Sequence, residues 1–360
     1  MSAPPTLGIE EEFVFLDEGT LSTTDAASDA VSALRATHDS HVKNEFHESQ
    51  IEYATPVAAD LRDAGRHLAG FRADLGRWAH ENAVIVVSSG TPFRVSQGSR
   101  LHVDERYSDI AASVAHLSDE HHINGMHVHV GVAGEAAGVR ASDALRPWLP
   151  VLLALSSNSP FWQGCDTGYA SWRALHSRRW TSYGVPPRFV TAAAHTRARQ
   201  VLRGVGATTD DGTVNWSVRL SAVHPTVETR VCDGQLDVSS TLALAALVRA
   251  LVSSAGDASV PRERAPGLWD AALWHAARHG VSADLVDPPT GRMAPARLAV
   301  VSLRRHVARQ LRESGDGGIV DRFLRRVLRD GSGAAAQWRA GRNGLAALAE
   351  LYRERLGSAY

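Results

Sequence analysis

Polar and apolar residues alternate in several short stretches of this chain, and residues 6–17 show the pattern most clearly. In a strand, successive side chains point to opposite faces, so Glu10 and Glu12 share one face and the apolar residues share the other. Glu11 falls on the apolar face, where its carboxylate would need an arginine partner or a place at the strand edge. Glu10 and Glu12 repel each other unless a positive charge, such as a divalent cation, lies between them. Alone, such a pair is more typical of a solvated acidic strand than of a binding site.

The same alternation predicts further strands, and apolar spacings of three, four or seven predict helices. The predicted strands lie at residues 6–17, 42–56 (a polar hairpin or strand), 83–87, 123–131, 215–220 and 225–233. The predicted helices lie at residues 27–35, 58–82 and 142–156, and from about 236 onwards only helices are predicted, with a turn at 288–291. Strands that alternate in polarity favour an antiparallel sheet with one polar face, and helices would cover the other face. The predicted fold class is therefore α+β.

No internal repeat, low-complexity tract or clear linker divides the chain. A length of 360 residues, of which 44% are hydrophobic and 21% charged, is ample for a large core. We therefore expect a single domain over residues 1–360, β-rich over 6–233 and helical over 236–360.

Composition and charge exclude several classes of protein. The net charge is −1 and no long basic run occurs, which argues against a nucleic-acid partner. No apolar run approaches the ~20 residues that span a bilayer, and the first residues lack the basic and apolar segments of a signal peptide. Cys165 and Cys232 are the only cysteines, which fits a reducing compartment and structural thiols. A soluble cytoplasmic protein is expected.

Residues that can bind metal or phosphate recur on one face of four predicted segments. His127 and His129 share a face of one strand, and Glu228 and Arg230 share a face of another, with apolar or β-branched residues behind them. One such pair is more often structural, but four coincidences are improbable for a solvated sheet. A functional site therefore becomes the favoured interpretation. Its side chains are Glu10, Glu12, Glu45, Glu52, His127, His129, Glu228 and Arg230.

Carboxylates outnumber imidazoles in this set, which suits Mg²⁺ or Mn²⁺ better than zinc. Such cations, held by carboxylates that converge with arginines, usually bind nucleotide phosphates. Arg219 and Arg230 flank Glu228 and could neutralise a transferring phosphoryl group or bind a substrate carboxylate. The chain has no Gly-x-x-x-x-Gly-Lys-Ser/Thr sequence, so phosphate binding through a P-loop is excluded.

Four motifs together are highly specific, although Glu-Glu-Glu or His-x-His alone would not be. They are Gly-Ile-Glu-Glu-Glu-Phe at 8–13, Met-His-Val-His-Val-Gly at 126–131, Ser-Asn-Ser-Pro-Phe-Trp-x-Gly-x-Asp-Thr-Gly-Tyr-Ala-Ser at 157–171 and Thr-Val-Glu-Thr-Arg-Val-Cys-Asp at 226–233. The set resembles the type 2 glutamate–cysteine ligases, and within them the bacterial carboxylate–amine ligases of the YbdK type. The wider superfamily includes glutamine synthetase. The resemblance runs in order from about residue 6 to the helical end.

The resemblance implies a curved, mostly antiparallel sheet of about six strands, with a polar concave face as the active site. Helices would cover the other face, and the C-terminal part would be all-helical. The implied activity is that of an ATP-dependent carboxylate–amine ligase. It would join glutamate, through an acyl phosphate, to the amine of an amino acid such as cysteine. ATP and Mg²⁺ or Mn²⁺ are the implied cofactors, and a homodimer is the implied assembly.

Roles for individual residues follow from matching the motifs position by position. His129 and Arg230 match positions near the nucleotide phosphates. Arg219 and Arg230, with Arg173 as a third, match the arginines around the acyl phosphate. The implied metal ligands are Glu10, Glu12, Glu45, Glu52, His127 and Glu228.

Some positions depart from the family pattern, and two other classes of protein remain open. Leu220 stands where the family usually has proline, and Trp338 where an arginine is expected; Trp172 and Trp180 are expected to pack. A metal hydrolase of the amidohydrolase type also carries His-x-His on a strand, but near the start of its chain and before repeated βα units. A nucleotide-binding regulatory protein with the ligase fold would be compatible with every residue named.

Overall fold

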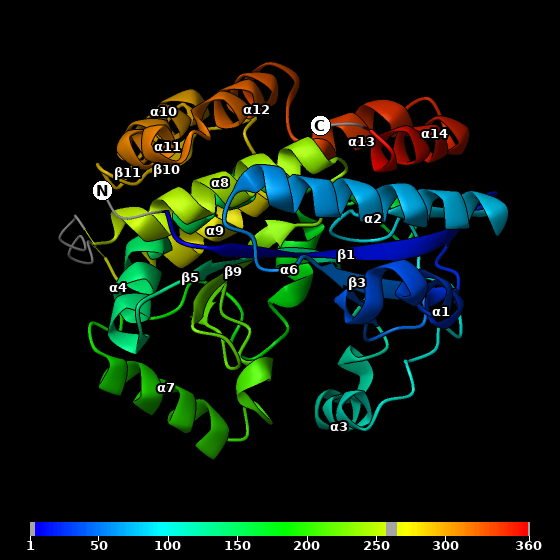
Figure 1. Ribbon diagram of the computed structural model, residues 1–360, viewed down its shortest axis with the longest axis horizontal. Helices are drawn as coiled ribbons and strands as arrows, with labels where there is room; N and C mark the ends of the chain where they lie inside the picture. Colours follow the sequence, from blue (N-terminus) through cyan, green and yellow to red (C-terminus); the bar gives the residue numbers. More distant parts are fainter. Residues whose placement is uncertain (1–3, 257–264, 359–360) are drawn as a thin grey trace.

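An antiparallel sheet lies at the centre of the computed structural model, which describes residues 4–256 and 265–358 (Figure 1). The strands follow the order β2–β3–β1–β5–β9–β8, and β4 also pairs with β1. Their bounds are β1 Leu7–Asp17, β2 Val42–Asn44, β3 Gln50–Ala54, β4 Val84–Val87, β5 Gly125–Gly131, β8 Val218–Leu220 and β9 Thr226–Asp233. Neighbouring strands all run antiparallel, as predicted. With β4 the sheet has seven strands, where about six were expected.

Helices make up most of the remaining structure. Their bounds are α1 Ala27–His38, α2 Leu61–Glu81, α3 Glu105–Val114, α4 Glu135–Leu145, α5 Leu149–Ser156, α6 Trp172–Ser177, α7 Ala192–Gly204, α8 Val238–Ser254, α9 Leu268–His279, α10 Ala296–His306, α11 Ala308–Ser314, α12 Gly317–Asp330, α13 Gly333–Gly341 and α14 Leu345–Leu356. In the part of the chain that the structure describes, no helix is both long and apolar enough to cross a membrane. Two predictions fall partly outside the described residues. The start of the chain that was examined for a signal peptide includes residues 1–3, and the part predicted to be helical includes residues 257–264 and 359–360.

The first strand organises the sheet because it pairs with three others, β3, β4 and β5. Its apolar face packs against α2, where the rings of Phe13 and Phe71 lie 5.6 Å apart between centroids. Burying such a side chain contributes roughly 1.5–3 kcal/mol. Glu11 is fully buried on this face and binds Arg72 of α2 at 2.7 Å, so the predicted arginine partner is present.

Local sequence explains why α2 forms where it does. The Asp60 side chain accepts a hydrogen bond from the backbone N–H of Asp63 at 2.9 Å, which caps the first turn. Leu68, Phe71 and Leu75 recur at spacings of three and four and are all buried. The stripe therefore docks on the sheet while the opposite face of α2 stays polar.

The C-terminal part is helical as expected, with one correction. Two short strands, β10 (Leu285–Asp287) and β11 (Arg292–Ala294), form a hairpin around the turn predicted at 288–291. Three-residue strands are too short for an alternating pattern to stand out from helical surroundings. The prediction of helices alone after residue 236 was therefore wrong at this hairpin.

Helices border both faces of the sheet, not only the apolar one. Figure 1 shows α2, α8 and the C-terminal helices on one side of β1, and α3 and α7 on the opposite side. The polar face is therefore walled by helices and connecting loops. This arrangement turns the polar face of the sheet into the floor of a cavity.

Candidate active site

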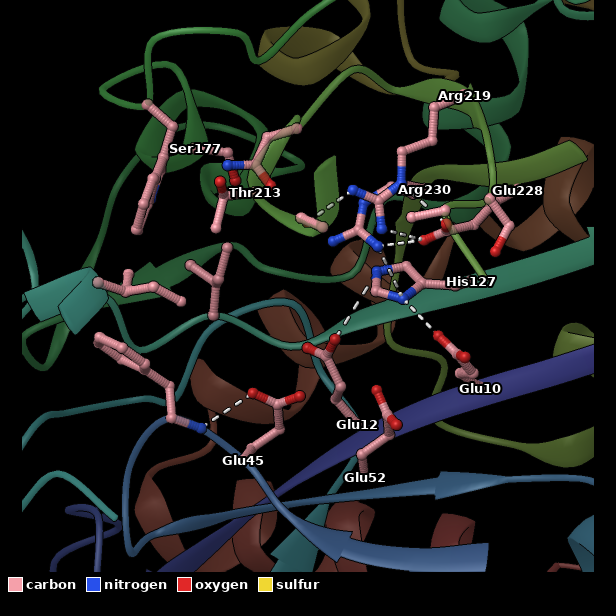
Figure 2. Close-up of a pocket in the computed structure, with 18 of the residues that line it drawn as sticks. Glu10, Glu12, Glu45, Glu52, His127, Ser177, Thr213, Arg219, Glu228 and Arg230 are labelled. Carbon is pink, nitrogen blue, oxygen red and sulfur yellow. Dashed lines mark hydrogen bonds and ion pairs between the residues drawn. The ribbon is translucent and has the colours of Figure 1, made fainter. Parts of the chain in front are cut away.

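A cavity of about 460 Å³ lies on the polar face of the sheet. All ten residues singled out in the sequence line it, and Figure 2 shows most of them converging from β1, β3, β5, β8 and β9. They are Glu10, Glu12, Glu45, Glu52, His127, His129, Arg173, Arg219, Glu228 and Arg230. Cross-strand register brings them together, because directly opposed side chains have Cβ atoms only ~5 Å apart.

Glu10 lies between two imidazoles of β5. It pairs in register with His127, whose Nδ1 is 3.0 Å from one carboxylate oxygen, and His129 Nε2 is 3.2 Å from the other. Burial alone would raise the pKa of Glu10, but the hydrogen bonds and charges of the two histidines hold it well below its usual value. Burial lowers the pKa of His127, and Arg230 adds to this effect. For His129 burial is outweighed by Glu10, which raises the pKa.

Three further carboxylates crowd the neighbouring end of the cavity. Glu12 pairs in register with Glu52, and Glu45 lies between β2 and β3. One oxygen of each lies within 4.8 Å of the others. Burial, followed by the charge of Glu12, raises the pKa of Glu45 to about 8, and burial with the neighbouring carboxylates raises that of Glu52 well above its usual value. Such closely spaced carboxylates ionise together only when a cation neutralises them.

Two arginines hold Glu228 at the far side of the cavity (Figure 2). Arg219 binds it through two hydrogen bonds, from Nε at 2.8 Å and from Nη2 at 3.1 Å, and Arg230 Nη1 donates to the same carboxylate. Burial would raise the pKa of Glu228, but the two guanidinium groups hold it far below its usual value. Glu228 is therefore an ionised carboxylate that fixes the position of two cationic groups.

The sequence reasoning missed much of the cavity wall. Arg106, Tyr107 and Ile110 of α3 line the cavity, as do Phe46 and Trp180. Helix α3 buries only Ile110, so it carries no stripe of apolar residues that would have signalled a helix. Trp180, expected to pack as part of a wall, lines the cavity, and its role stays a prediction. Phe46 and Tyr107 occupy positions that look in the sequence like any other aromatic position, so nothing there marked them as part of the cavity.

The side chains of this cavity suit a divalent cation that prefers oxygen ligands. The carboxylate and imidazole groups fall into overlapping sets in which one atom from each residue lies within 4.8 Å of the rest. Carboxylates dominate every set, as Mg²⁺ and Mn²⁺ prefer. The sets are Glu10–Glu52–His127, Glu10–His129–Glu228 and Glu12–Glu45–Glu52. His129, predicted at the nucleotide phosphates, thus also stands among possible ligands.

Carboxylates and imidazoles that converge with arginines on one polar face form the kind of site that binds divalent cations together with nucleotide phosphates. The sequence agrees, since the model of glutamate–cysteine ligase family 2 (GCS2) matches residues 6–355. This chain belongs to that family. The predicted family and class of enzyme, an ATP-dependent ligase, are confirmed; the YbdK-type branch stays a prediction.

Curated relatives support the same family. The protein named "Putative glutamate–cysteine ligase 2-1" of Nocardia farcinica is 38% identical over 340 residues, which cover 93% of this chain and 88% of the relative. The protein named "Putative glutamate–cysteine ligase 2" of Salinispora tropica is 40% identical over 341 residues, covering 93% and 89%.

Solved structures share the fold at low sequence identity. A bifunctional glutathione synthetase from Pasteurella multocida aligns with a TM-score of 0.73 at 15% identity, covering 99% of this chain. This chain spans about half of that protein, 53% of its length. A glutamate–cysteine ligase from Francisella tularensis, solved in complex with AMP, aligns with a TM-score of 0.72 at 12% identity, covering 99% of this chain and 90% of that one. These likenesses confirm the predicted fold class.

Proposed function

We propose that this chain activates a glutamate-like carboxylate with ATP and joins it to the amine of an amino acid such as cysteine. One observation carries the proposal: the six side chains predicted as metal ligands and the three arginines predicted at the acyl phosphate converge in one cavity on the polar face of the sheet. The printed names of the relatives support glutamate and cysteine as the first substrates to test. A homodimer and a cytoplasmic location also stay predictions.

The carboxylates and His127 would hold one or more Mg²⁺ or Mn²⁺ ions. Glu12, Glu45 and Glu52 form one group of donors, and Glu10, His127 and Glu228 supply the remaining ones. A bound cation would neutralise charge on the ATP phosphates. Without it, burial and mutual repulsion raise the pKa of Glu45 to about 8, so this end of the cavity favours a positive ion.

The arginines would act on the phosphoryl group and the substrate carboxylate. In the first step a carboxylate oxygen attacks the γ-phosphorus of ATP, ADP leaves and an acyl phosphate forms. In the second step the neutral amine nitrogen attacks the acyl carbon, the amide bond forms, the bond from the acyl carbon to the phosphate oxygen breaks so that phosphate leaves, and the nitrogen gives up one proton to solvent. Arg219 and Arg230, fixed by Glu228, would neutralise the charge that both steps carry on phosphate oxygens.

No covalent protein nucleophile is required by these steps. Neither cysteine lines the cavity: Cys165 is exposed, and Cys232, a residue of β9, is buried. Burial raises the pKa of Cys232 to about 12, so its thiol stays protonated at neutral pH. The structural role expected for the two cysteines stays a prediction.

The decisive experiment measures phosphate release from Mg-ATP with glutamate and a panel of amino acids. We expect release that requires both glutamate and one amine. Glu12→Gln should lower the rate about 100-fold or more, since loss of a metal ligand removes several kcal/mol of charge stabilisation. Glu18→Gln is the matched control, because Glu18 is an exposed glutamate just beyond β1 that pairs with Arg353. Tight Mg-ATP binding without turnover for any pair would contradict ligation and favour the regulatory alternative.

A further inference from the structure

Asp233, the last residue of β9, is a fully buried carboxylate that lies behind the cavity wall and is not among its lining residues. It accepts hydrogen bonds from the backbone N–H of Asn158 at 2.8 Å, from Ser159 Oγ at 2.7 Å and from Ser171 Oγ at 2.8 Å. A Cβ atom added at Gly90 would lie 2.6 Å from its carboxylate carbon, so the group is tightly enclosed. Nothing in the proposed chemistry uses this acid directly.

The two serines connect Asp233 to the first turn of α6. Ser159 Oγ accepts a hydrogen bond from the backbone N–H of Arg173 at 3.1 Å, and Ser171 Oγ caps the helix by accepting from Ala174 N–H at 3.2 Å. Each hydroxyl therefore accepts from the helix and donates to the same carboxylate. The backbone of Arg173 is fixed relative to Asp233 by these contacts.

The Arg173 side chain also depends on Asp233. Its guanidinium is buried at 4% exposure and lines the cavity, with Nη1 3.9 Å from a carboxylate oxygen of Asp233. Nη2 donates to the backbone oxygen of Arg230 at 3.2 Å, whereas Nε and Nη1 have no hydrogen-bond partner. Burial raises the pKa of Asp233, and the charge of Arg173 is the first influence that opposes it. Asp233 is thus the nearest counter-charge of a buried cation that has few other contacts.

We propose that Asp233 is a positioning residue of the active site, which holds the Arg173 guanidinium at the cavity wall for the anionic part of the acid substrate. The inference rests on the proposed ligase function. Misplacing a charged group by a small distance weakens its interaction with the substrate, whereas ATP bound to other residues is unaffected. Loss of Asp233 should therefore act on the acid substrate more than on ATP.

The test compares Asp233→Asn with Asp237→Asn, which neutralises another buried carboxylate. For Asp233→Asn we expect kcat/KM for glutamate to fall by roughly 10–100-fold, the range seen for groups that orient site residues from behind, and the KM for Mg-ATP to stay within about two-fold. Asp237→Asn is the control: Asp237 is also buried, caps α8 and pairs with Arg326, but lies outside the cavity lining. Ser171→Ala, which removes one hydrogen bond to Asp233, provides a milder variant if Asp233→Asn does not fold.

Three outcomes would overturn the proposal. If Asp233 acts through Arg173, then Asp233→Asn should have little further effect in an Arg173→Met background; fully additive losses would contradict it. Equal losses for glutamate and ATP, matching those of Asp237→Asn, would indicate a structural role only. A crystal structure of Asp233→Asn, or of Ser171→Ala, tests the positioning role without any measurement of activity. An Arg173 guanidinium that stays in place in the variant would contradict the proposal. Absence of ligation by the unmodified chain would instead count against the proposed function.

Discussion

Three consecutive glutamates meet three different environments. Glu10 hydrogen-bonds two imidazoles, Glu11 is buried against Arg72 and Glu12 accepts a backbone hydrogen bond from Gly125 at 2.6 Å. The two-residue period of a strand separates them, because it turns Glu11 to the core and its neighbours to the cavity. The same side chain is therefore a core ion-pair partner in one position and a candidate metal ligand one residue away.

The two histidines of β5 should differ in what they bind. His127 lies between Glu10 and Glu12, with Nε2 3.7 Å from the latter, whereas His129 faces Glu228 and hydrogen-bonds Thr226 through Nδ1 at 3.0 Å. We expect His127→Asn to weaken Mn²⁺ binding at least about tenfold, since a ligand is lost, and His129→Asn mainly to raise the KM for ATP. Mn²⁺ titration beside ATP kinetics measures both effects. Equal weakening of Mn²⁺ binding in both variants would place His129 among the metal ligands.

His176 should make stability depend on pH. Burial, followed by the charge of Arg179, lowers the pKa of His176 to about 4, and its Nε2 hydrogen-bonds the backbone oxygen of Glu120. Since the unfolded chain takes up this proton near pH ~6.5, the stabilisation is complete at neutral pH and is lost as the pH falls from ~6.5 to about 4, where the folded protein also binds the proton. The full loss should approach about 3.5 kcal/mol, because the shift of roughly 2.5 pKa units counts for ~1.4 kcal/mol per unit.

Urea unfolding at pH 7.5 and pH 4.5 measures that loss. Burial also lowers the pKa of His122, so the unmodified protein loses stability over the same pH range for more than one reason. Comparing it with His176→Gln isolates the contribution of His176. His176→Gln should be less stable than the unmodified protein at pH 7.5 but lose less on acidification. A variant whose stability falls by the same amount as that of the unmodified protein would contradict the assignment.

At the scale of whole elements, the sequence predicted those with a strong periodic pattern and missed those without one. Strand β1 and helix α2 were predicted within a few residues, because each buries a regular stripe. Helix α7 buries only His195 and α3 only Ile110, so neither carries a pattern to find. Val300, Leu303, Val307 and Leu311 are spaced like the apolar stripe of one helix, but the structure ends α10 at His306 and continues as α11 from Ala308. All four residues are buried, so both helices turn the same side towards the core.

The docking of α2 on β1 should depend on a single buried cation. Arg72 binds Glu11 and donates to the backbone oxygens of Gln235 and Leu236 at 2.8 and 2.9 Å, which joins α2, β1 and the segment between β9 and α8. Arg72→Met should lower the free energy of unfolding by about 3–5 kcal/mol, because it leaves a buried carboxylate without its partner. Urea denaturation measures the change.

An exposed arginine on the same helix supplies the comparison for this prediction. Arg66 pairs with Asp63 at 2.7 Å, and its side chain is 64% exposed. Arg66→Met should cost no more than about 1 kcal/mol, as exposed ion pairs do. If Arg72→Met proved as mild as Arg66→Met, the buried pair would not be what fixes α2 on the sheet.

At the scale of the whole molecule, the site exists because the sheet brings together segments more than 200 residues apart. The sequence indicated which strands carry polar faces, so the ligand-type residues could be named in advance. It could not reveal register, which sets Glu12 opposite Glu52 and His129 opposite Glu228. It also could not show the walls, since loops and weakly patterned helices contribute them. The roles of the ten named residues stay predictions that the experiments above address.

Binding of a divalent cation should stabilise the entire fold. In the metal-free protein, burial and the neighbouring carboxylates disfavour the ionised forms of Glu45 and Glu52, and this cost is present only in the folded state. A ligand that binds only the folded protein adds about 2.7 kcal/mol at one hundred times its Kd. Melting temperatures with Mn²⁺ or Mg²⁺ should therefore exceed those with EDTA, at ionic strength matched with KCl to separate binding from screening. Glu52→Gln should raise the metal-free melting temperature, because it removes a carboxyl whose ionised form the folded protein disfavours, and it should shrink the rise caused by the metal. Equal rises in the unmodified protein and the variant would mean that the cation binds elsewhere, and the acidic end of the cavity would lose its proposed role.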